Sequence, residues 1–360
     1  MTRRTKAVAG AALLVAIASA GWLWFGNEGL SSDNGAYSSE IEQTMGSMQN
    51  HCLGRFIVPL PQGSSAAVAT SIVESPFSYR GKVSRHEFRK LLEERWQVLQ
   101  GKTHDASKRP YASPATRTDL TEDAVIFSSE HIRLDLGGPG FEGKELAQTE
   151  GYLWREGHLF HFTQRRNSAR HIASAMSALQ VREFNIVPSG EGLCSAGSFF
   201  ADPREGDPGE AVRFAIDIPA APPMLLNFET VTLLSAEQQA GLKPGEPDFL
   251  FDGNKDFQGK VLRERRRDVA GRPGREMISA FTAKEGGTYQ TSISAQWFSP
   301  GEVGGGAKLP HVKIKLEVGY ASREEPAKWA AFPDSDESGR SPEAKFMGLW
   351  QAILDGTRLR

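Results

Sequence analysis

The sequence predicts an α+β fold of two domains, each a mostly antiparallel sheet with packed amphipathic helices, preceded by an N-terminal hydrophobic helix. The chain has 360 residues, more than the roughly 250–300 at which a single core stops growing. It contains 37 glycines and 20 prolines, together 57 of 360 residues or about 16%. The usual share of glycine and proline is about 12%, so the excess indicates many turns between short strands. Strand-like runs also alternate with a few helical stripes.

Composition excludes some classes of protein. Lys and Arg number 42 against 44 Asp and Glu, a formal charge of −2, whereas a nucleic-acid-binding protein normally carries a basic surplus. Hydrophobic residues make up 39% and charged residues 24%, as in chains that bury a core. The chain is therefore expected to fold and to have no nucleic-acid partner.

The N-terminus carries an export signal. Three cations among the first six residues precede an uncharged run over 7–25, which is long enough to cross a bilayer. Positive charge before the run keeps the N-terminus in the cytoplasm and exports the rest of the chain. Residues 1–30 are therefore predicted to be a signal peptide or a membrane anchor, and residues 31–50 a tether.

Two outcomes stay open for this segment. Ala18-Ser19-Ala20 is typical of a signal-peptide cleavage site. The aromatic run Trp22–Phe25 instead favours an uncleaved anchor that holds the chain to the inner membrane through residues 7–25. Either outcome places the remainder in the periplasm.

The first domain is predicted over 51–188. Ser84 begins a helix, and Glu87 three residues later completes a capping box. A hairpin is expected around Glu156-Gly157. The other expected elements are strands 56–58, 66–73, 125–129 and 132–136, an exposed loop over 101–119, and a helix over 169–179.

The second domain is predicted over 189–360, after the turn-rich segment 188–192. Val312–Val318 alternates apolar and charged residues, which is typical of a half-buried strand. Pro342 begins a terminal helix. The expected strands are 193–200, 212–218, 224–234, 257–266, 275–283, 288–298 and 311–319.

Cys52 and Cys194 are the only cysteines. Two thiols in an exported chain are most simply interpreted as one disulfide. The alternative is two separate buried thiols. A catalytic cysteine is disfavoured because no histidine-bearing signature accompanies either residue.

Other motifs fail on chemistry, so no catalytic, cofactor or metal site is predicted. Residues 138–145 resemble a phosphate-binding loop, but Glu145 stands where a hydroxyl is needed. Asp252–Asp256 resembles the start of a calcium loop without its glycine. His158 and His161 lie three apart on an expected strand, so they face opposite sides.

The run over 263–267 contains four arginines. Alternation on a strand places Arg263, Arg265 and Arg267 on one face. They form either a solvated sheet face or anchors for an acidic partner, since arginine is frequent at interface hot spots.

Four short motifs occur in order: His51–Pro61, Gly190–Cys194, Trp297–Gly301 and Leu349–Arg360. With them, residues 51–360 resemble the two-domain immunity proteins that bacteria keep against type VI secretion phospholipase effectors. The segment Gly301–Lys308 departs from that pattern because it is rich in glycine.

The resemblance implies a periplasmic inhibitor, not an enzyme, that binds a cognate lipase effector and occludes its active site or lid. Exposed loops over 101–119, 201–210 and 300–310 are candidate contact surfaces. Two alternatives stay open: an exported envelope structural or assembly module, and an exported hydrolase whose site is not linear in sequence.

Overall fold

The computed structural model describes residues 47–73, 75–102, 111, 113–134, 144–164, 169–202, 209–220, 223–242, 257–285, 287–322 and 342–360. They belong to one compact unit, Glu40–Arg360. The expected N-terminal hydrophobic helix and its cleavage site lie outside these residues. Within the described ranges, every helix is too short or too polar to cross a bilayer.

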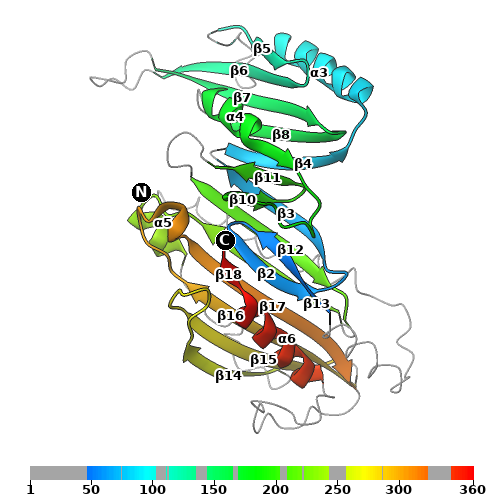
Figure 1. Ribbon diagram of the computed structural model, residues 1–360, viewed down its shortest axis with the longest axis vertical. Coiled ribbons are helices and arrows are strands. Elements are labelled where there is room, and N and C mark those ends of the chain that lie inside the picture. Colours follow the sequence, from blue (N-terminus) through cyan, green and yellow to red (C-terminus); the bar gives the residue numbers. More distant parts are fainter. Residues whose placement is uncertain are drawn as a thin grey trace, which may run out of the picture. The chain divides into compact units, whose positions relative to one another are not determined.

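A twelve-stranded antiparallel sheet forms the body of this unit (Figure 1), with the strand order β14-β15-β16-β17-β13-β12-β3-β4-β8-β7-β6-β5. Its strands are β3 (Ser65–Val73), β4 (Ser75–Lys82), β5 (Thr116–Thr121), β6 (Ala124–Leu134), β7 (Lys144–Arg155), β8 (His158–Gln164), β12 (Glu210–Ile218), β13 (Met224–Val231), β14 (Phe257–Arg266), β15 (Arg275–Glu285), β16 (Thr288–Ser299) and β17 (His311–Ser322).

Strands from both halves of the chain share this sheet. β3 pairs with β12, so Ala69 lies opposite Phe214, and Figure 1 shows the two strands side by side. One hydrophobic core runs beneath both, from Phe160 and Ile172 to Ile293 and Trp350. The division into domains at residues 188 and 189 stays a prediction.

Two three-stranded sheets complete the strand content of the described ranges. One contains β1 (Met48–Leu53), β2 (Phe56–Pro61) and β18 (Arg358–Leu359), so the C-terminus pairs with an early strand. The other contains β9 (Leu179–Val181), β10 (Gly192–Ser195) and β11 (Ser198–Ala201). β1 begins within the segment that the sequence assigned to the tether.

The helix α3 (Arg85–Gln100) carries the predicted capping box, in which the Ser84 hydroxyl accepts from the Glu87 amide and the Glu87 carboxylate accepts from the Ser84 amide. Its buried side chains Phe88, Leu92 and Leu99 pack on β6, β7 and β8. The other helices are α4 (Ala169–Ala178), α5 (Ala236–Gly241), η1 (Gly306–Lys308) and α6 (Pro342–Gly356).

The predicted fold class, mostly antiparallel sheets with packed helices, is confirmed for the described residues. Four local expectations were wrong. The two strands expected over 125–129 and 132–136 are one strand, β6, whose register with β7 shifts between Ser129 and Ile132. The single strand expected over 193–200 is a hairpin, because Gly197 adopts a φ of +63° and turns the chain between β10 and β11. The loop expected over 101–119 includes the start of β5, which pairs with β6. The strand expected over 224–234 ends at Val231, and Leu233 instead bridges to Val303.

Candidate functional site

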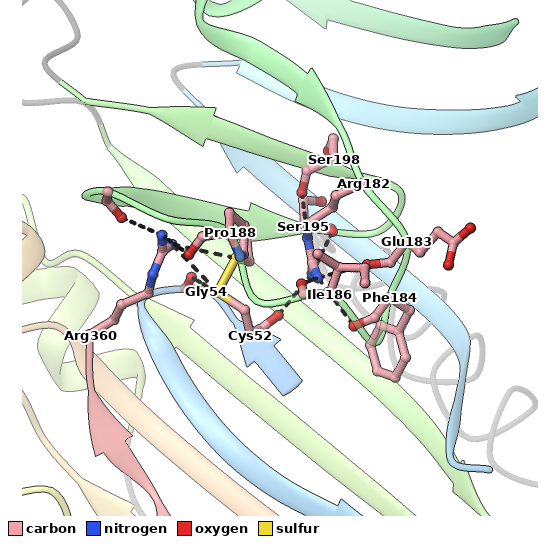
Figure 2. The surroundings of a disulfide bond; sticks show 12 residues. Cys52, Gly54, Arg182, Glu183, Phe184, Ile186, Pro188, Ser195, Ser198 and Arg360 are labelled. Atoms are coloured by element: carbon pink, nitrogen blue, oxygen red, sulfur yellow. Dashed lines mark hydrogen bonds between the residues drawn. A yellow bond between two sulfur atoms is a disulfide. The ribbon is translucent and has the colours of Figure 1, made fainter. Parts of the chain in front are cut away.

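The Cys52–Cys194 disulfide lies where three of the four sequence motifs meet (Figure 2). The sulfur atoms are 2.02 Å apart, and both cysteines are fully buried. Beside them, Gly54 and Cys194 exchange two backbone hydrogen bonds of 3.1 and 2.8 Å. Gly54 has a φ of +60°, and a Cβ there would lie 2.6 Å from Thr230 Cγ2. The His51–Pro61 motif therefore needs glycine at this position to reach β10.

Arg182 forms a hub on one side of the disulfide (Figure 2). Its Nη2 donates to the carbonyl oxygens of Cys52 at 2.9 Å and Ser195 at 3.1 Å. Its Nε donates to the Ser198 carbonyl at 3.1 Å. Its Nη1 donates to three further carbonyls, those of residues 183, 184 and 186. Burial, together with the charge of Arg360, lowers the pKa of Arg182 to about 10. No sequence motif singled out this residue.

Arg360, the last residue, covers the other side of the disulfide. Its Nη1 lies 3.7 Å from Cys52 Sγ and 3.8 Å from Cys194 Sγ. Its Nη2 donates to the carbonyl oxygens of Pro188, at 2.8 Å, and of Gly190. Its backbone amide donates to the Arg55 carbonyl at 3.0 Å. The terminal motif thus closes onto both the first and the second motif.

Arg55 extends the same cluster toward β12. It forms a two-pronged ion pair with Glu210, with both distances 2.8 Å, and a second pair of 2.6 Å with Asp202. Burial favours a lower pKa for Arg55, but the two carboxylates outweigh it and raise that pKa. The motif residues therefore hold the segments around Arg55, Cys194, Glu210 and Arg360 together.

The arginine run at the end of β14, from Arg263 to Arg267, is partly used inside the protein. Arg265 and Arg267 both pair with Glu276, and the Arg267 distance is 3.1 Å. Trp350 Nε1 on α6 donates to Glu276 at 2.7 Å, and Arg267 also reaches Asp355 at 2.6 Å. The Arg267 side chain is only 9% exposed. Arg265 and Arg267 thus fix α6 to β15, and an interface role for Arg263, Arg265 and Arg267 stays a prediction.

A groove with a volume of about 940 Å³ brings that run to a second predicted contact segment, the loop over 300–310. Its lining comes from the end of β14, the turn before β15, and the segment after β16; the residues are Glu264, Arg265, Arg266, Gly271, Arg272, Pro273, Gly274, Arg275, Phe298, Ser299, Pro300, Gly301, Glu302 and Leu309. We call it the arginine groove. No pattern in the sequence indicated that residues 264–275 and 298–309 meet.

A cluster of titratable side chains lies beneath α3. Arg95 Nε and the Tyr152 hydroxyl each donate to Glu150 at 2.9 Å. Burial acts to raise the pKa of Glu150, but these hydrogen bonds outweigh it and lower that pKa. His161 stacks on Tyr152, and burial lowers its pKa to about 4. His161 Nε2 lies 4.0 Å from Glu150 and lacks a hydrogen-bond partner among the described residues.

Other predicted segments are only partly described. The phosphate-loop-like glycine turn and the calcium-loop-like segment lie outside the described residues, as does most of the loop over 201–210. Within the ranges that the structure describes, no three His, Cys, Asp or Glu side chains gather closely enough to hold a metal. His158 contacts Tyr79 at 2.8 Å, whereas His161 contacts Tyr152, so the two histidines have separate surroundings.

Three solved structures resemble this fold. The apo immunity protein TplEi of the type VI secretion system of Pseudomonas aeruginosa has a TM-score of 0.58 and 18% identity, covering 87% of this chain and 97% of that chain. The same immunity protein complexed with "L" peptide has a TM-score of 0.56 and 16% identity, covering 87% of this chain and 98% of that chain. The crystal structure of the Tle4–Tli4 complex has a TM-score of 0.58 and 16% identity, covering 88% of this chain and 98% of the matched chain.

Sequence comparisons give a narrower result. No curated protein matches the chain. Residues 186–360 match the family described as the Tle cognate immunity protein 4 C-terminal domain. This family consists of immunity proteins and not of enzymes. The matched segment includes the arginine groove, and the match supports an immunity protein for a lipase effector.

Proposed function

We propose that this chain is a periplasmic immunity protein that binds a Tle-class lipase effector and covers its active site or its lid. The observation that carries the proposal is the match of residues 186–360 to the Tli4 C-terminal domain. The likeness to the Tle4–Tli4 structure over 88% of the chain supports it, because it extends the shared fold beyond that domain.

The internal contacts suit a protein that acts by shape. A binding surface that is ordered before docking loses little conformational entropy on association. Here the disulfide and the hydrogen bonds of Arg55, Arg182 and Arg360 fix the first strand, the 188–195 segment and the C-terminus against one another. These contacts support a preformed surface.

The predicted export signal and the disulfide support a periplasmic location, since disulfides persist in that compartment. The target of a phospholipase is the membrane itself, so an inhibitor must act before the enzyme reaches lipid. A docked body that buries about 1,600 Å² or more excludes substrate without any chemistry of its own. Anchoring through residues 7–25 would place the inhibitor at the threatened surface.

Binding and inhibition by the purified chain test the proposal. Residues 31–360 are mixed with the lipase encoded beside the gene, and the mixture is analysed by size-exclusion chromatography and by phospholipid hydrolysis. We expect a stoichiometric complex and loss of hydrolysis, whereas an unrelated lipase stays active. Absence of both effects at micromolar concentration rejects the proposal.

A further inference from the structure

We propose that the arginine groove binds an acidic segment on the surface of the lipase effector. This inference rests on the function proposed above and names the chemistry of one contact. The groove is lined by four arginines and two glutamates, a local excess of positive charge on a chain whose formal charge is −2.

Arg272 is the buried charge of the groove. The residue is only 6% exposed, and its Nη1 and Nη2 donate to the carbonyl oxygens of Lys308, at 3.0 Å, and Pro310. Its Nε has no hydrogen-bond partner within the described part of the chain. Both of its hydrogen-bond acceptors are neutral carbonyls. Glu302, which also lines the groove, is the nearby carboxylate whose charge acts on Arg272. Because charges interact more strongly where water is excluded, Arg272 together with the other lining arginines favours a further anion in the groove.

Arg266 and Arg275 supply accessible donors at the groove. Arg266 is the last residue of β14, and its side chain is exposed. Arg275 pairs with Glu264, and both of these side chains are about half exposed. An exposed pair of this kind contributes little to stability. Arg275 can therefore exchange Glu264 for a carboxylate of the partner at little cost.

Exposed apolar side chains beside the groove indicate a protein partner. Leu309 in the lining is 37% exposed, and Val303 on the same loop is 44% exposed. Leu233 bridges to Val303, which places Leu234, 59% exposed, beside this loop. Arginines next to apolar side chains are typical of protein interfaces. The segment that fits carries Asp or Glu flanked by apolar residues.

Charge reversal tests the groove. The full chain, as recovered from the periplasm, is prepared as R266E/R275E, and its affinity for the lipase encoded beside the gene is measured by calorimetry. We expect the dissociation constant to rise about tenfold or more, because close charge pairs across interfaces are strongly coupled. The charge-retaining R266K/R275K variant should stay within about threefold of the parent.

The matched control is R89E/K90E on α3, which makes the same charge change at two exposed positions. Equal weakening by this control would show general electrostatic steering and overturn the inference. If the parent and the control both bind the lipase and R266E/R275E binds it equally well, the groove inference is wrong and the proposed function stands. If the parent protein itself fails to bind the lipase, both the groove inference and the proposed function are wrong.

Two further measurements test the role of the Arg272 charge and the alternative that the groove binds lipid. R272Q removes the buried positive charge, whereas R272K keeps it. Both variants lose the guanidinium group that donates to the Lys308 and Pro310 carbonyls. We expect R272Q to bind the lipase more weakly than R272K at equal melting temperature. Binding of the parent to phosphatidylglycerol vesicles that R266E/R275E abolishes, with lipase affinity unchanged, would identify a lipid site and overturn the inference.

Discussion

The guanidinium carbon of Arg360 lies 4.7 Å from the centre of the Phe199 ring. This contact seats the last side chain of the protein over a disulfide whose cysteines are 142 residues apart. Arg360 Nη1 approaches both sulfur atoms, and Nη2 is held by the Pro188 and Gly190 carbonyls. The Arg360 side chain therefore covers the Cys52–Cys194 disulfide.

Removing that cover should expose the disulfide to reductant. We expect R360A to be reduced by dithiothreitol several-fold faster than the parent, because thiol–disulfide exchange depends on access to sulfur. Timed alkylation followed by mass measurement reports the rate. R358A is the control, since Arg358 is exposed on β18, two residues before Arg360, and its side chain donates to the Gly356 carbonyl. Equal rates for R360A and R358A would show that Arg360 does not shield the bond.

Truncating Arg182 should be strongly destabilising. R182M removes the guanidinium donor from six backbone carbonyls. The Glu183 carbonyl keeps the Ile186 amide as a donor, and buried acceptors that stay unpaired cost about 1–3 kcal/mol each. We expect the free energy of unfolding in urea to fall by about 3 kcal/mol or more, because only part of that loss is recovered by relaxation. R213M, which removes a largely exposed arginine from β12, should change it by less than about 1 kcal/mol. A small effect of R182M would mean that water replaces the guanidinium.

Neutralising Glu276 should loosen α6. The fully buried carboxylate faces Arg265, Arg267 and the Trp350 indole. E276Q removes the buried negative charge beside the nearly buried Arg267, which keeps Asp355 as its charged partner, so we expect a loss of about 2–4 kcal/mol in stability. The matched change E264Q removes an exposed pair with Arg275 and should cost about 1 kcal/mol at most. Hydrogen exchange should rise selectively in residues 346–354 of E276Q, and uniform protection would contradict the link to α6.

Acid should destabilise the protein through His161. Burial lowers its pKa from 6.5 to about 4, against an opposing attraction from Glu150 and with added repulsion from Arg80 and Arg95. Between these two values the unfolded chain binds a proton that the native state does not. The contribution of His161 is therefore complete above pH 6.5 and is lost as the pH falls toward 4.

The measurement is the melting temperature from pH 7 to pH 4.5. H161Q should show a smaller fall than the parent, while H86Q, at an exposed position on α3, should follow the parent. Part of the fall will persist in H161Q, because burial also lowers the pKa of His311 to about 4. Identical curves for H161Q and the parent would exclude His161 as the acid-sensitive group.

Local patterns predicted many of the elements. The capping box at Ser84 and Glu87 and the alternation over 312–318 depend on neighbours within a few residues, so they can be read from the chain directly. The β10–β11 hairpin was missed because its turn depends on Gly197 at positive φ within a continuous apolar run. The pattern of apolar residues alone does not distinguish one strand from two short ones.

Residue patterns were enough to predict the class of fold, most strands and the capped helix. They also predicted the pairing of Cys52 with Cys194, since two thiols in a chain that is predicted to be exported offer one partner for each. Three relationships emerged only in the folded chain: Arg182 binds six carbonyls, Glu276 holds α6, and the Arg265 and loop 300–310 segments form one groove. The physical reason is distance along the chain. Hydrogen bonds and charges between residues tens to hundreds of positions apart depend on how the strands pair, and no local periodicity records that pairing.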